Sequence, residues 1–388
     1  MKRLKVVTIV GTRPELIKLS RVIAELDRYM DHVLVHTGQN HDYELSEIFF
    51  EQLQIRRPDH FLEAAGKSAA ETIANVISRS DVVLEEESPD AVLLLGDTNS
   101  CLAAIAAKRR KLPIFHMEAG NRSFDERVPE EINRKIVDHI SDINLTYTEH
   151  ARRYLVAEGL DPTRVIKTGT PMTEVLAYYR PGIEASLVLA ELGLETDGYF
   201  VVSAHREENV DDPVRLGALL GALSAVAEHY GKPVIVSTHP RTRQRLGANG
   251  LIVDSNVRSS LIRFIEPLGL LDYVRLQMEA FCVLSDSGSV TEEASALNLP
   301  AVTIRDAHER PEGMDETTVV MSGLSPERVL QAVELVTSQH QRDRRGFRPV
   351  PDYESVNVSQ KVVRIILSYV EYVNARVWQR PPSLAALD

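Results

Sequence analysis

Short runs of consecutive apolar residues recur along almost the whole chain, separated by stretches of helical period. The runs are rich in β-branched residues and lack apolar–polar alternation, which indicates strands buried on both faces in parallel sheets covered by helices. The clearest runs are Val6–Val10, Val33–Val35, Ala91–Leu95, Leu112–Phe115, Phe200–Val202, Val234–Val236, Cys282–Leu284 and Ala301–Ile304. The sequence therefore predicts an α/β protein built from repeated strand–helix units.

The strand–helix unit occurs in both halves of the 388-residue chain, and a chain of this length is expected to form two or three domains. A first helix is predicted to begin near Pro14, and Asp212-Pro213 begins a corresponding helix past the middle. Their apolar faces consist of Leu16, Leu19, Ile23 and Leu26 in the first helix and of Leu216, Leu219, Leu223 and Val226 in the second. We therefore predict two doubly wound, Rossmann-like domains with a cleft between them, because ligands bind beyond the carboxyl ends of such strands.

Changes in composition suggest the domain boundaries. Tyr178–Gly182 has the composition of a hinge, and the irregular stretch Arg342–Pro351 precedes a C-terminal amphipathic helix. We predict an N-terminal domain over 1–178, a second domain over 179–355 and a C-terminal helical segment over 356–388.

Charge and cysteine content exclude several classes of function. The formal net charge is −12, so phosphate backbones and anionic lipid surfaces would repel the chain, which argues against nucleic acid and membranes as partners. Cys101 and Cys282 are too few for a disulfide framework or a thiolate metal cluster. No apolar run approaches the roughly 18 residues of a spanning helix, and the first run fits a buried strand better than a secretory signal. We expect a cytoplasmic protein.

The first predicted strand–helix turn contains cationic side chains in place of a nucleotide fingerprint. Gly11-Thr12-Arg13 matches neither the glycine pattern of dinucleotide-binding proteins nor that of a P-loop. Arg13 follows the strand and Lys18 lies one turn into the helix, an arrangement that suits an anion such as a diphosphate. The alternative is an ordinary surface ion pair.

Carboxylates follow two further strands of the same half. Asp97 follows the run Ala91–Leu95, Glu118 follows Leu112–Phe115, and Glu130 begins a predicted helix that also carries Arg134. The carboxyl ends of parallel strands meet at one sheet edge, where neighbouring carboxylates can act as an acid and a base at neutral pH. Each of them could instead cap or decorate a helix terminus.

The second half contains a similar turn and two histidines after strands. Ser287, Gly288 and Ser289 lie between a strand and a helix, where backbone amides could bind phosphate oxygens, and Glu293 in that helix could bind a sugar diol. His205 and His239 each follow a strand, at positions suited to proton donation.

The remaining motifs favour neither hydrolysis nor a metal. No G-x-S-x-G elbow accompanies the histidines, and they show no metal-ligand spacing, so we predict no structural metal. A charged loop that contains Arg310 follows the last long apolar run and could close over a ligand.

Taken together, these stretches resemble the non-hydrolysing UDP-N-acetylglucosamine 2-epimerase family over nearly the whole chain. Members of this family have two Rossmann-like domains in a GT-B arrangement, and their C-terminal helix crosses back to the first domain. They are usually homodimers. The motifs, in family order, are GTRPELIKLSRV, HTGQNHDYE, GDTNS, HMEAGNR, PEEINR, SAHREENV, STHPRTR, SDSGSVTEEA and IRDAHERPEG.

The resemblance implies C2 epimerisation of a UDP-2-acetamido sugar, with no external cofactor. Anti elimination of UDP gives a 2-acetamidoglycal, and UDP adds back after reprotonation on the other face. Matched by motif, Asp97, Glu118 and Glu130 form the acid–base set, and His205 lies beside the departing diphosphate. The expected UDP-sugar contacts are Arg13, Ser287 and the Gly288 and Ser289 amides for the diphosphate, Glu293 for the ribose, the backbone near Tyr273 for the uracil, and additionally Lys18, Asn40, Arg134, His239 and Arg310.

Departures from the glucosamine epimerases point to a branch. The chain has Gln39-Asn40 where GQH or AQH is common, Asn121 where VEAGLR has leucine, and Ser289 where SGG has glycine. It is more similar to the branch that converts UDP-2-acetamido-2,6-dideoxy-L-talose to UDP-N-acetyl-L-fucosamine for surface polysaccharide. Gly66–Ser68 also departs from the segment that helps to form a second, activating UDP-sugar site, so we expect no such activation.

Several alternatives stay open at this stage. The same chemistry could act on UDP-N-acetylglucosamine and UDP-N-acetylmannosamine, or convert UDP-2-acetamido-L-rhamnose to its L-quinovosamine epimer. Hydrolysis to UDP and free amino sugar is a different reaction class, and a GT-B glycosyltransferase would share the fold but require an acceptor. A binding protein without catalysis is the simplest alternative.

Overall fold

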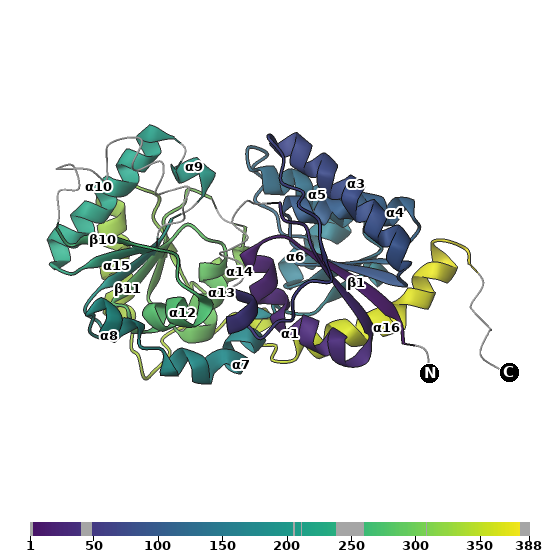
Figure 1. Cartoon of the computed structure of the whole chain (residues 1–388). Helices are drawn as coiled ribbons and strands as arrows, with labels where there is room; N and C mark the ends of the chain where they lie inside the picture. Colours follow the sequence, from purple (N-terminus) through teal and green to yellow (C-terminus); the bar gives the residue numbers. More distant parts are fainter. Residues whose placement is uncertain are drawn as a thin grey trace. The chain divides into compact units, whose positions relative to one another are not determined.

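The computed structural model describes residues 3–39, 49–204, 206–210, 212–237, 260–307 and 309–380. The chain divides into two compact units, Met1–Ala177 with Ser355–Asp388 and Tyr178–Glu354. Each unit contains one parallel sheet with helices packed around it (Figure 1).

The first unit contains a seven-stranded sheet in the order β3-β2-β1-β4-β5-β6-β7. Every strand pair is parallel. The strands are β1 (Lys5–Val10), β2 (Asp31–His36), β3 (His60–Phe61), β4 (Ala91–Leu95), β5 (Ile114–Met117), β6 (Ile143–Thr146) and β7 (Val165–Lys167). The helices are α1 (Arg13–Tyr29), α3 (Ala69–Glu87), η1 (Asn99–Ala103), α4 (Ala104–Arg109), α5 (Pro129–Ile140), α6 (Glu149–Ala157), η2 (Pro162–Arg164), α7 (Met172–Ala185), which continues past the unit boundary, and α16 (Val358–Arg376).

The second unit contains a six-stranded parallel sheet in the order β10-β9-β8-β11-β12-β13. The strands are β8 (Phe200–Ser203), β9 (Val234–Ser237), β10 (Ile262–Ile265), β11 (Cys282–Ser285), β12 (Ala301–Thr303) and β13 (Val320–Met321). The helices are α8 (Val188–Leu192), α9 (Glu207–Val210), α10 (Pro213–Tyr230), α12 (Leu270–Glu279), α13 (Ser289–Leu297), α14 (Pro311–Asp315), α15 (Pro326–Gln339) and η3 (Pro351–Tyr353).

Both sheets therefore have the doubly wound strand order, which reverses between β1 and β4 and between β8 and β11. The predicted α/β fold with two parallel sheets is confirmed. Each of the eight apolar runs overlaps a strand, and six lie wholly within one; β12 ends at Thr303, one residue before the end of its run, and β5 begins at Ile114 instead of Leu112. Pro113 lies between these two residues, and it has no N–H to donate to the ladder.

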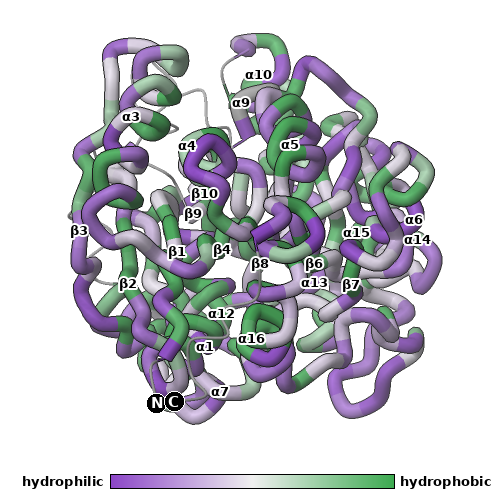
Figure 2. The backbone as a smooth tube through the Cα atoms, turned by 90° about the vertical axis from the view of Figure 1, so that its right-hand side faces the viewer, coloured by the Kyte–Doolittle hydropathy of each residue, from purple (hydrophilic) through white to green (hydrophobic). Residues whose placement is uncertain are grey.

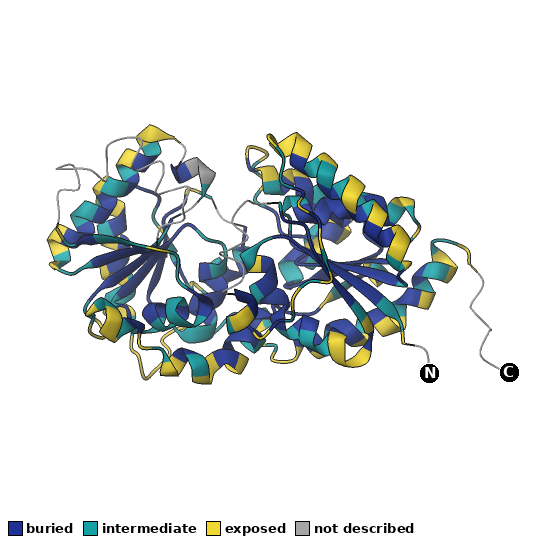
Figure 3. Cartoon of the chain, in the orientation of Figure 1, coloured by how far each residue is buried: buried dark blue, intermediate teal, exposed yellow. Residues whose placement is uncertain are grey.

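Burial explains why the strands read as unbroken apolar runs. Except for the edge strands β3, β7, β10 and β13, the strands of both sheets are buried along most of their length (Figure 3). Along β1 and β4 the backbone tube has largely the colour of hydrophobic residues (Figure 2). A strand covered on both faces has no solvent side on which polar residues would alternate.

Helix α1 follows from its sequence in the way that was predicted. Thr12 is its N-cap, Glu15 completes a capping box, and Pro14 lies in the first turn. The predicted apolar face is buried, with Leu16 and Leu19 fully covered. Helix α16 packs against α1, so the last described helix belongs to the first unit.

The irregular linker that the composition of Tyr178–Gly182 suggested is not present, because these residues lie inside α7. Pro181 and Gly182 suggested an irregular linker, yet Val175, Tyr179 and Ile183 are buried at helical spacing. Burial of this apolar face outweighs the weak helix propensity of proline and glycine. The boundary between the units nevertheless falls in this helix, between Ala177 and Tyr178.

None of the helices in the described part of the chain is both long and apolar enough to cross a membrane.

Candidate active site

The carboxyl ends of β1, β4 and β5 are neighbours in the first sheet. Arg13 lies just beyond β1, Asp97 just beyond β4, and Glu118 directly after β5. The strand order therefore brings the first predicted turn and two of the predicted carboxylates to one edge of the sheet. Ligands of doubly wound sheets bind at this edge.

Glu118 forms a buried ion pair with Lys18 of α1. The Lys18 Nζ lies 2.9 Å from Oε1 and 2.7 Å from Oε2 of Glu118, and the two side chains are only 9% and 10% exposed. Glu118 has a left-handed backbone, with φ of 62°, a conformation that costs about 1–3 kcal/mol for a residue other than glycine. The Glu118 carboxylate lies close to the turn at Gly96: a Cβ atom added to Gly96 would be 3.8 Å from Glu118 Oε2. Such strain at a sheet edge is typical of a functional position.

Asp97 is paired with Arg134 of α5. The Arg134 Nε lies 3.0 Å from Oδ2 of Asp97, and NH2 donates to the same oxygen. The Asp97 side chain is 22% exposed, whereas that of Arg134 is 2% exposed. A buried guanidinium therefore holds the Asp97 carboxylate in place while the carboxylate keeps access to solvent.

The first turn of α5 carries two glutamates with different surroundings. Glu131 is fully buried and accepts hydrogen bonds from the N–H and hydroxyl of Ser123 and from Arg134. Glu130 is half-buried and, four residues before Arg134, lies on the same helix face. Glu131 therefore stabilises the N-terminus of α5, whereas Glu130 is accessible enough to contact a ligand.

A buried network supports the segment that carries Glu118. His116 Nε2 lies 2.7 Å from the Gly96 carbonyl, and its Nδ1 lies 3.0 Å from Oδ1 of Asp138. Asp138 also accepts the Gly120 N–H and pairs with Arg122 at 2.7 Å. Burial opposes ionisation of Asp138, but His116 and Arg122 together hold its pKa below the usual value. The network fixes the backbone on both sides of Glu118.

In the second unit, Ser287, Gly288 and Ser289 form the turn between β11 and α13. The Ser287 hydroxyl contacts both the N–H, at 3.3 Å, and the hydroxyl, at 3.0 Å, of Ser289. Gly288 is the N-cap of α13 and has no side chain to occupy the helix terminus. The turn therefore presents hydroxyls and a positive helix end, which suit an anion.

Arginine side chains surround this turn. An added Cβ at Gly288 would lie 3.5 Å from Arg310 Nε and 4.0 Å from Arg206 NH2. Arg310 pairs with buried Glu292 at 2.7 Å, and Arg206 approaches Glu309 at 3.3 Å. The cationic groups are thus held in place by carboxylates of the same unit.

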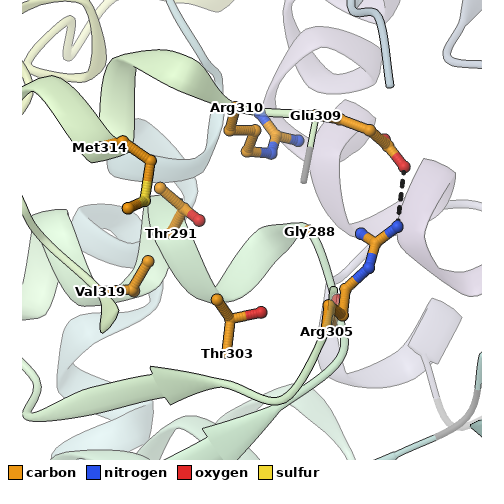
Figure 4. Close-up of a pocket in the computed structure, with 9 residues that line it drawn as sticks. Gly288, Thr291, Thr303, Arg305, Glu309, Arg310, Met314 and Val319 are labelled. Carbon is orange, nitrogen blue, oxygen red and sulfur yellow. Dashed lines mark hydrogen bonds and ion pairs between the residues drawn. The ribbon is translucent and has the colours of Figure 1, made fainter. Parts of the chain in front are cut away.

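A pocket opens beside the turn, where Arg305 and Glu309 point toward one another (Figure 4). Its lining consists of Ser287, Gly288, Thr291, Thr303, Arg305, Glu309, Arg310, Met314 and Val319. The predicted contacts Ser287, Gly288 and Arg310 therefore line one pocket.

Glu293 and Tyr273 are linked through Gln277. Gln277 is 1% exposed, and its Nε2 donates to Glu293 Oε2 at 2.6 Å. Burial, followed by the charge of Glu293, raises the pKa of Tyr273, and hydrogen bonds with Ser203 and Gln277 oppose that rise. The Gln277 amide therefore holds the carboxylate of Glu293, the predicted ribose contact.

Three predicted site residues, Asn40, His205 and His239, lie outside the described residues. Within the described ranges, no group of three or more His, Cys, Asp or Glu side chains is arranged to hold a metal ion.

The sequence did not single out His116, Asp138, Gln277 or Glu292 as site residues. His116 lies within the motif HMEAGNR, so its position two residues before Glu118 was the available signal. Glu292 lies within the motif SDSGSVTEEA, next to Glu293, whereas Gln277 gave no signal, because its partner lies on another helix.

Comparison with known proteins decides the family. Residues 24–367 match the family described as UDP-N-acetylglucosamine 2-epimerase. The chain belongs to this family. The resemblance inferred from the motifs is confirmed at this level, and so is the predicted enzyme class, because these epimerases are isomerases.

Solved members of the family have the same fold. The structure of UDP-N-acetylglucosamine 2-epimerase from Rickettsia bellii is 54% identical, covers 97% of this chain and 100% of its own, and superposes with a TM-score of 0.90. The enzyme from Methanocaldococcus jannaschii, in complex with UDP-GlcNAc and UDP, is 33% identical over 94% of this chain and 100% of its own, with a TM-score of 0.87.

One relative acts on a different sugar. The UDP-2,3-diacetamido-2,3-dideoxy-D-glucuronate 2-epimerase of Pseudomonas aeruginosa is 37% identical over 79% of this chain and 84% of its own length. The family therefore includes 2-epimerases for more than one UDP-sugar.

The contact between Gln277 and Glu293 leads to a first prediction. If Glu293 binds the ribose, as the motif predicts, Gln277→Leu should weaken UDP binding about 5- to 10-fold, because the buried Glu293 carboxylate loses the hydrogen bond that it accepts from Gln277. Isothermal titration with UDP measures this loss, and turnover at saturating substrate should change less than twofold. The matched control is Gln331→Leu, since Gln331 bonds only to Arg328 on the outside of α15. Unchanged UDP affinity in Gln277→Leu would contradict the assigned role of Glu293.

Proposed function

We propose that the chain epimerises a UDP-2-acetamido sugar at C2 by anti elimination and re-addition of UDP. The observation that carries this proposal is the pair of carboxylates at the edge of the first sheet, Glu118 against Lys18 and Asp97 against Arg134. Membership of the UDP-N-acetylglucosamine 2-epimerase family supports it.

The proposed chemistry needs a base, an acid and a stabilised leaving group. A carboxylate takes the C2 proton while the bond between C1 and the diphosphate oxygen breaks, which gives a 2-acetamidoglycal and UDP. A carboxylic acid on the other face then returns a proton to C2, and the diphosphate attacks C1 again. Asp97, Glu118 and Glu130 form the proposed acid–base set, whose members exchange roles between the two directions of the reaction.

In the proposed enzyme, the second unit holds UDP. Ser287, the Gly288 and Ser289 amides and Arg310 bind the diphosphate, supported by the positive end of α13. Glu293 binds the ribose diol, and the backbone near Tyr273 binds the uracil. The other proposed contacts to the UDP-sugar are Arg13, Lys18, Asn40, Arg134, His205 and His239.

The proposed substrate is UDP-2-acetamido-2,6-dideoxy-L-talose, and the product is UDP-N-acetyl-L-fucosamine. The branch-specific wording of several motifs supports this choice, and one of these residues lies in the candidate site. Asn121, where the glucosamine branch commonly has leucine, is buried with its Nδ2 3.5 Å from Glu118 Oε1. An amide beside a proton-transfer carboxylate alters the polarity next to the sugar, which is a means of substrate selection.

A second candidate keeps the chemistry and changes the sugar to UDP-N-acetylglucosamine. The observation that favours it is the 54% identity to the Rickettsia bellii protein, which is described as an epimerase of that sugar. UDP-2-acetamido-L-rhamnose is a further substrate for the same chemistry.

We also propose that the enzyme acts as a homodimer in the cytoplasm. The two cysteines are free and buried, which fits a reducing compartment. The homodimer rests on the family resemblance.

The carboxylate assignment makes a second prediction. Asp97→Asn and Glu118→Gln should each lower turnover by at least about 100-fold, because general acid–base catalysis contributes on the order of 10²–10⁴. UDP affinity, measured by titration, should stay within about threefold, because these residues face the sugar in the proposed enzyme. A parallel loss of UDP affinity would instead assign them to nucleotide binding or to the structure.

The substrate assignment makes a third prediction. Nuclear magnetic resonance of the products from separate incubations should show efficient C2 inversion of the 6-deoxy-L-talose substrate and little turnover of UDP-N-acetylglucosamine. Asn121→Leu should shift the ratio of kcat/KM toward UDP-N-acetylglucosamine by about 10-fold, the size expected for one altered polar contact. Turnover of UDP-N-acetylglucosamine alone by the wild type would overturn the choice of sugar.

A further inference from the structure

Glu15, a buried carboxylate in the first turn of α1, has more hydrogen bonds than a helix cap requires. Its Oε2 accepts the Gly11 N–H at 2.8 Å, the Thr12 N–H at 2.7 Å and the Thr12 hydroxyl at 2.8 Å. These three hydrogen bonds belong to the capping box at the start of α1, and they fix the turn that precedes Arg13.

The second oxygen of Glu15 reaches a different strand. Its Oε1 accepts the hydroxyl of Thr98 at 2.9 Å, across 83 residues of sequence. Thr98 directly follows Asp97 and is the N-cap of η1, whose Ser100 N–H it accepts at 3.3 Å. Helix capping does not explain this contact, because the Oε2 atom already meets the needs of α1.

The two turns joined by Glu15 are packed directly against one another. An added Cβ at Gly11 would lie 2.0 Å from the Ser100 Oγ and 2.1 Å from the Thr37 Oγ1, so only glycine fits there. These two hydroxyls are themselves hydrogen-bonded at 2.8 Å. The turn after β1 therefore has no room to move toward the turn after β4.

The turn that carries Asp97 is held from its other side by α5. The Nδ2 of Asn133 donates to the Asp97 carbonyl at 3.0 Å and lies 3.2 Å from Oδ1 of Asn99. The backbone around Asp97 is therefore held by Glu15 of α1 through Thr98 and by Asn133 of α5.

We propose that Glu15 is a positioning residue, which holds the Asp97 turn against the Arg13 turn by binding Thr98 and Gly11-Thr12 at the same time. This inference rests on the proposed function, in which Asp97 transfers a proton and Arg13 binds the diphosphate. The two groups must keep a fixed separation during the reaction, since a displacement of about 1 Å can cost on the order of 100-fold in rate.

The Thr98 contact also bears on the protonation of Glu15. Burial raises the pKa of Glu15 to about 7, and the bonds from Gly11, Thr12 and Thr98 act against the rise. Without the Thr98 hydroxyl, the protonated form of the Glu15 carboxyl would be favoured. A protonated carboxyl carries an O–H donor, which cannot pair with the N–H donors of Gly11 and Thr12. The Thr98 contact therefore also opposes protonation of Glu15, and so favours the carboxylate form that accepts from Gly11 and Thr12.

The test compares Thr98→Val, which removes the hydroxyl, with Thr98→Ser, which keeps it. We expect kcat to fall about 10-fold in Thr98→Val and less than twofold in Thr98→Ser. KM and UDP affinity should change little in either variant, because Thr98 is not a proposed substrate contact. A purely structural role would instead lower the melting temperature without this split between kcat and KM.

Thr163→Val is the matched control, because its hydroxyl also donates to a carboxylate, that of Asp161 at 2.8 Å. Thr163 lies in η2, directly before β7, and therefore at the amino end of a strand, whereas Thr98 follows the carboxyl end of β4 in the same sheet. Its kcat should equal that of the wild type, and any loss of melting temperature calibrates the structural effect of one such bond.

A double-mutant cycle isolates the contact itself. If Glu15 acts on Asp97 through Thr98, the combination of Glu15→Gln with Thr98→Val should lower kcat no further than Glu15→Gln alone. Should Glu15→Gln fail to fold, the two Thr98 variants decide the question. A kcat of Thr98→Val within twofold of the wild type, or an equal fall in Thr98→Ser, would overturn the proposal.

The two proposals fail in different ways. A wild-type enzyme that exchanges no C2 proton in any UDP-2-acetamido sugar would reject the proposed function. An active wild type whose Thr98→Val variant keeps full kcat would reject only the role of Glu15.

Discussion

Buried charge at the edge of the first sheet is the constraint on which the site depends. Lys18 and Glu118 are both about nine-tenths covered, and their pairing keeps either charge from being buried alone, which would cost on the order of 3–5 kcal/mol. The pair requires α1 to start directly after β1 and Glu118 to adopt a left-handed backbone after β5. The same ion pair thus sets both the local fold and the direction of the proposed proton-transfer carboxylate.

The repeated sheet lets the two units carry different chemistry. Both sheets have the same reversal of strand order. In the first unit, carboxylates paired with basic side chains follow the strands, and in the second unit a turn of serines and a glycine lies next to two arginines. Proton transfer needs carboxylates whose charges are held apart, whereas a departing diphosphate needs cations and amides. In the proposed enzyme these opposite requirements are met on separate sheets.

Much of the fold was predictable, because buried parallel strands appear as unbroken apolar runs, and Asp97 and Glu118 were visible as polar residues directly after such runs. The helical course of Tyr178–Gly182 was missed, since burial of Tyr179 and Ile183 overrides the local preference of Pro181. The contacts of Glu15 with Thr98 and of Gln277 with Glu293 join different elements, so no local pattern announces them. The sequence indicates which residues lie at the carboxyl ends of the strands, but the hydrogen bonds between these residues are visible only in the folded structure.

The central claim is that a proton leaves and returns at C2 of a UDP-2-acetamido sugar. Incubation of the enzyme with this substrate in deuterated water, followed by mass spectrometry and nuclear magnetic resonance, measures that exchange directly. We expect one solvent deuterium at C2 of the epimerised product, and at equilibrium the UDP should remain covalently attached to the sugar. Product without deuterium at C2, or stoichiometric release of UDP with free or transferred sugar, would contradict it.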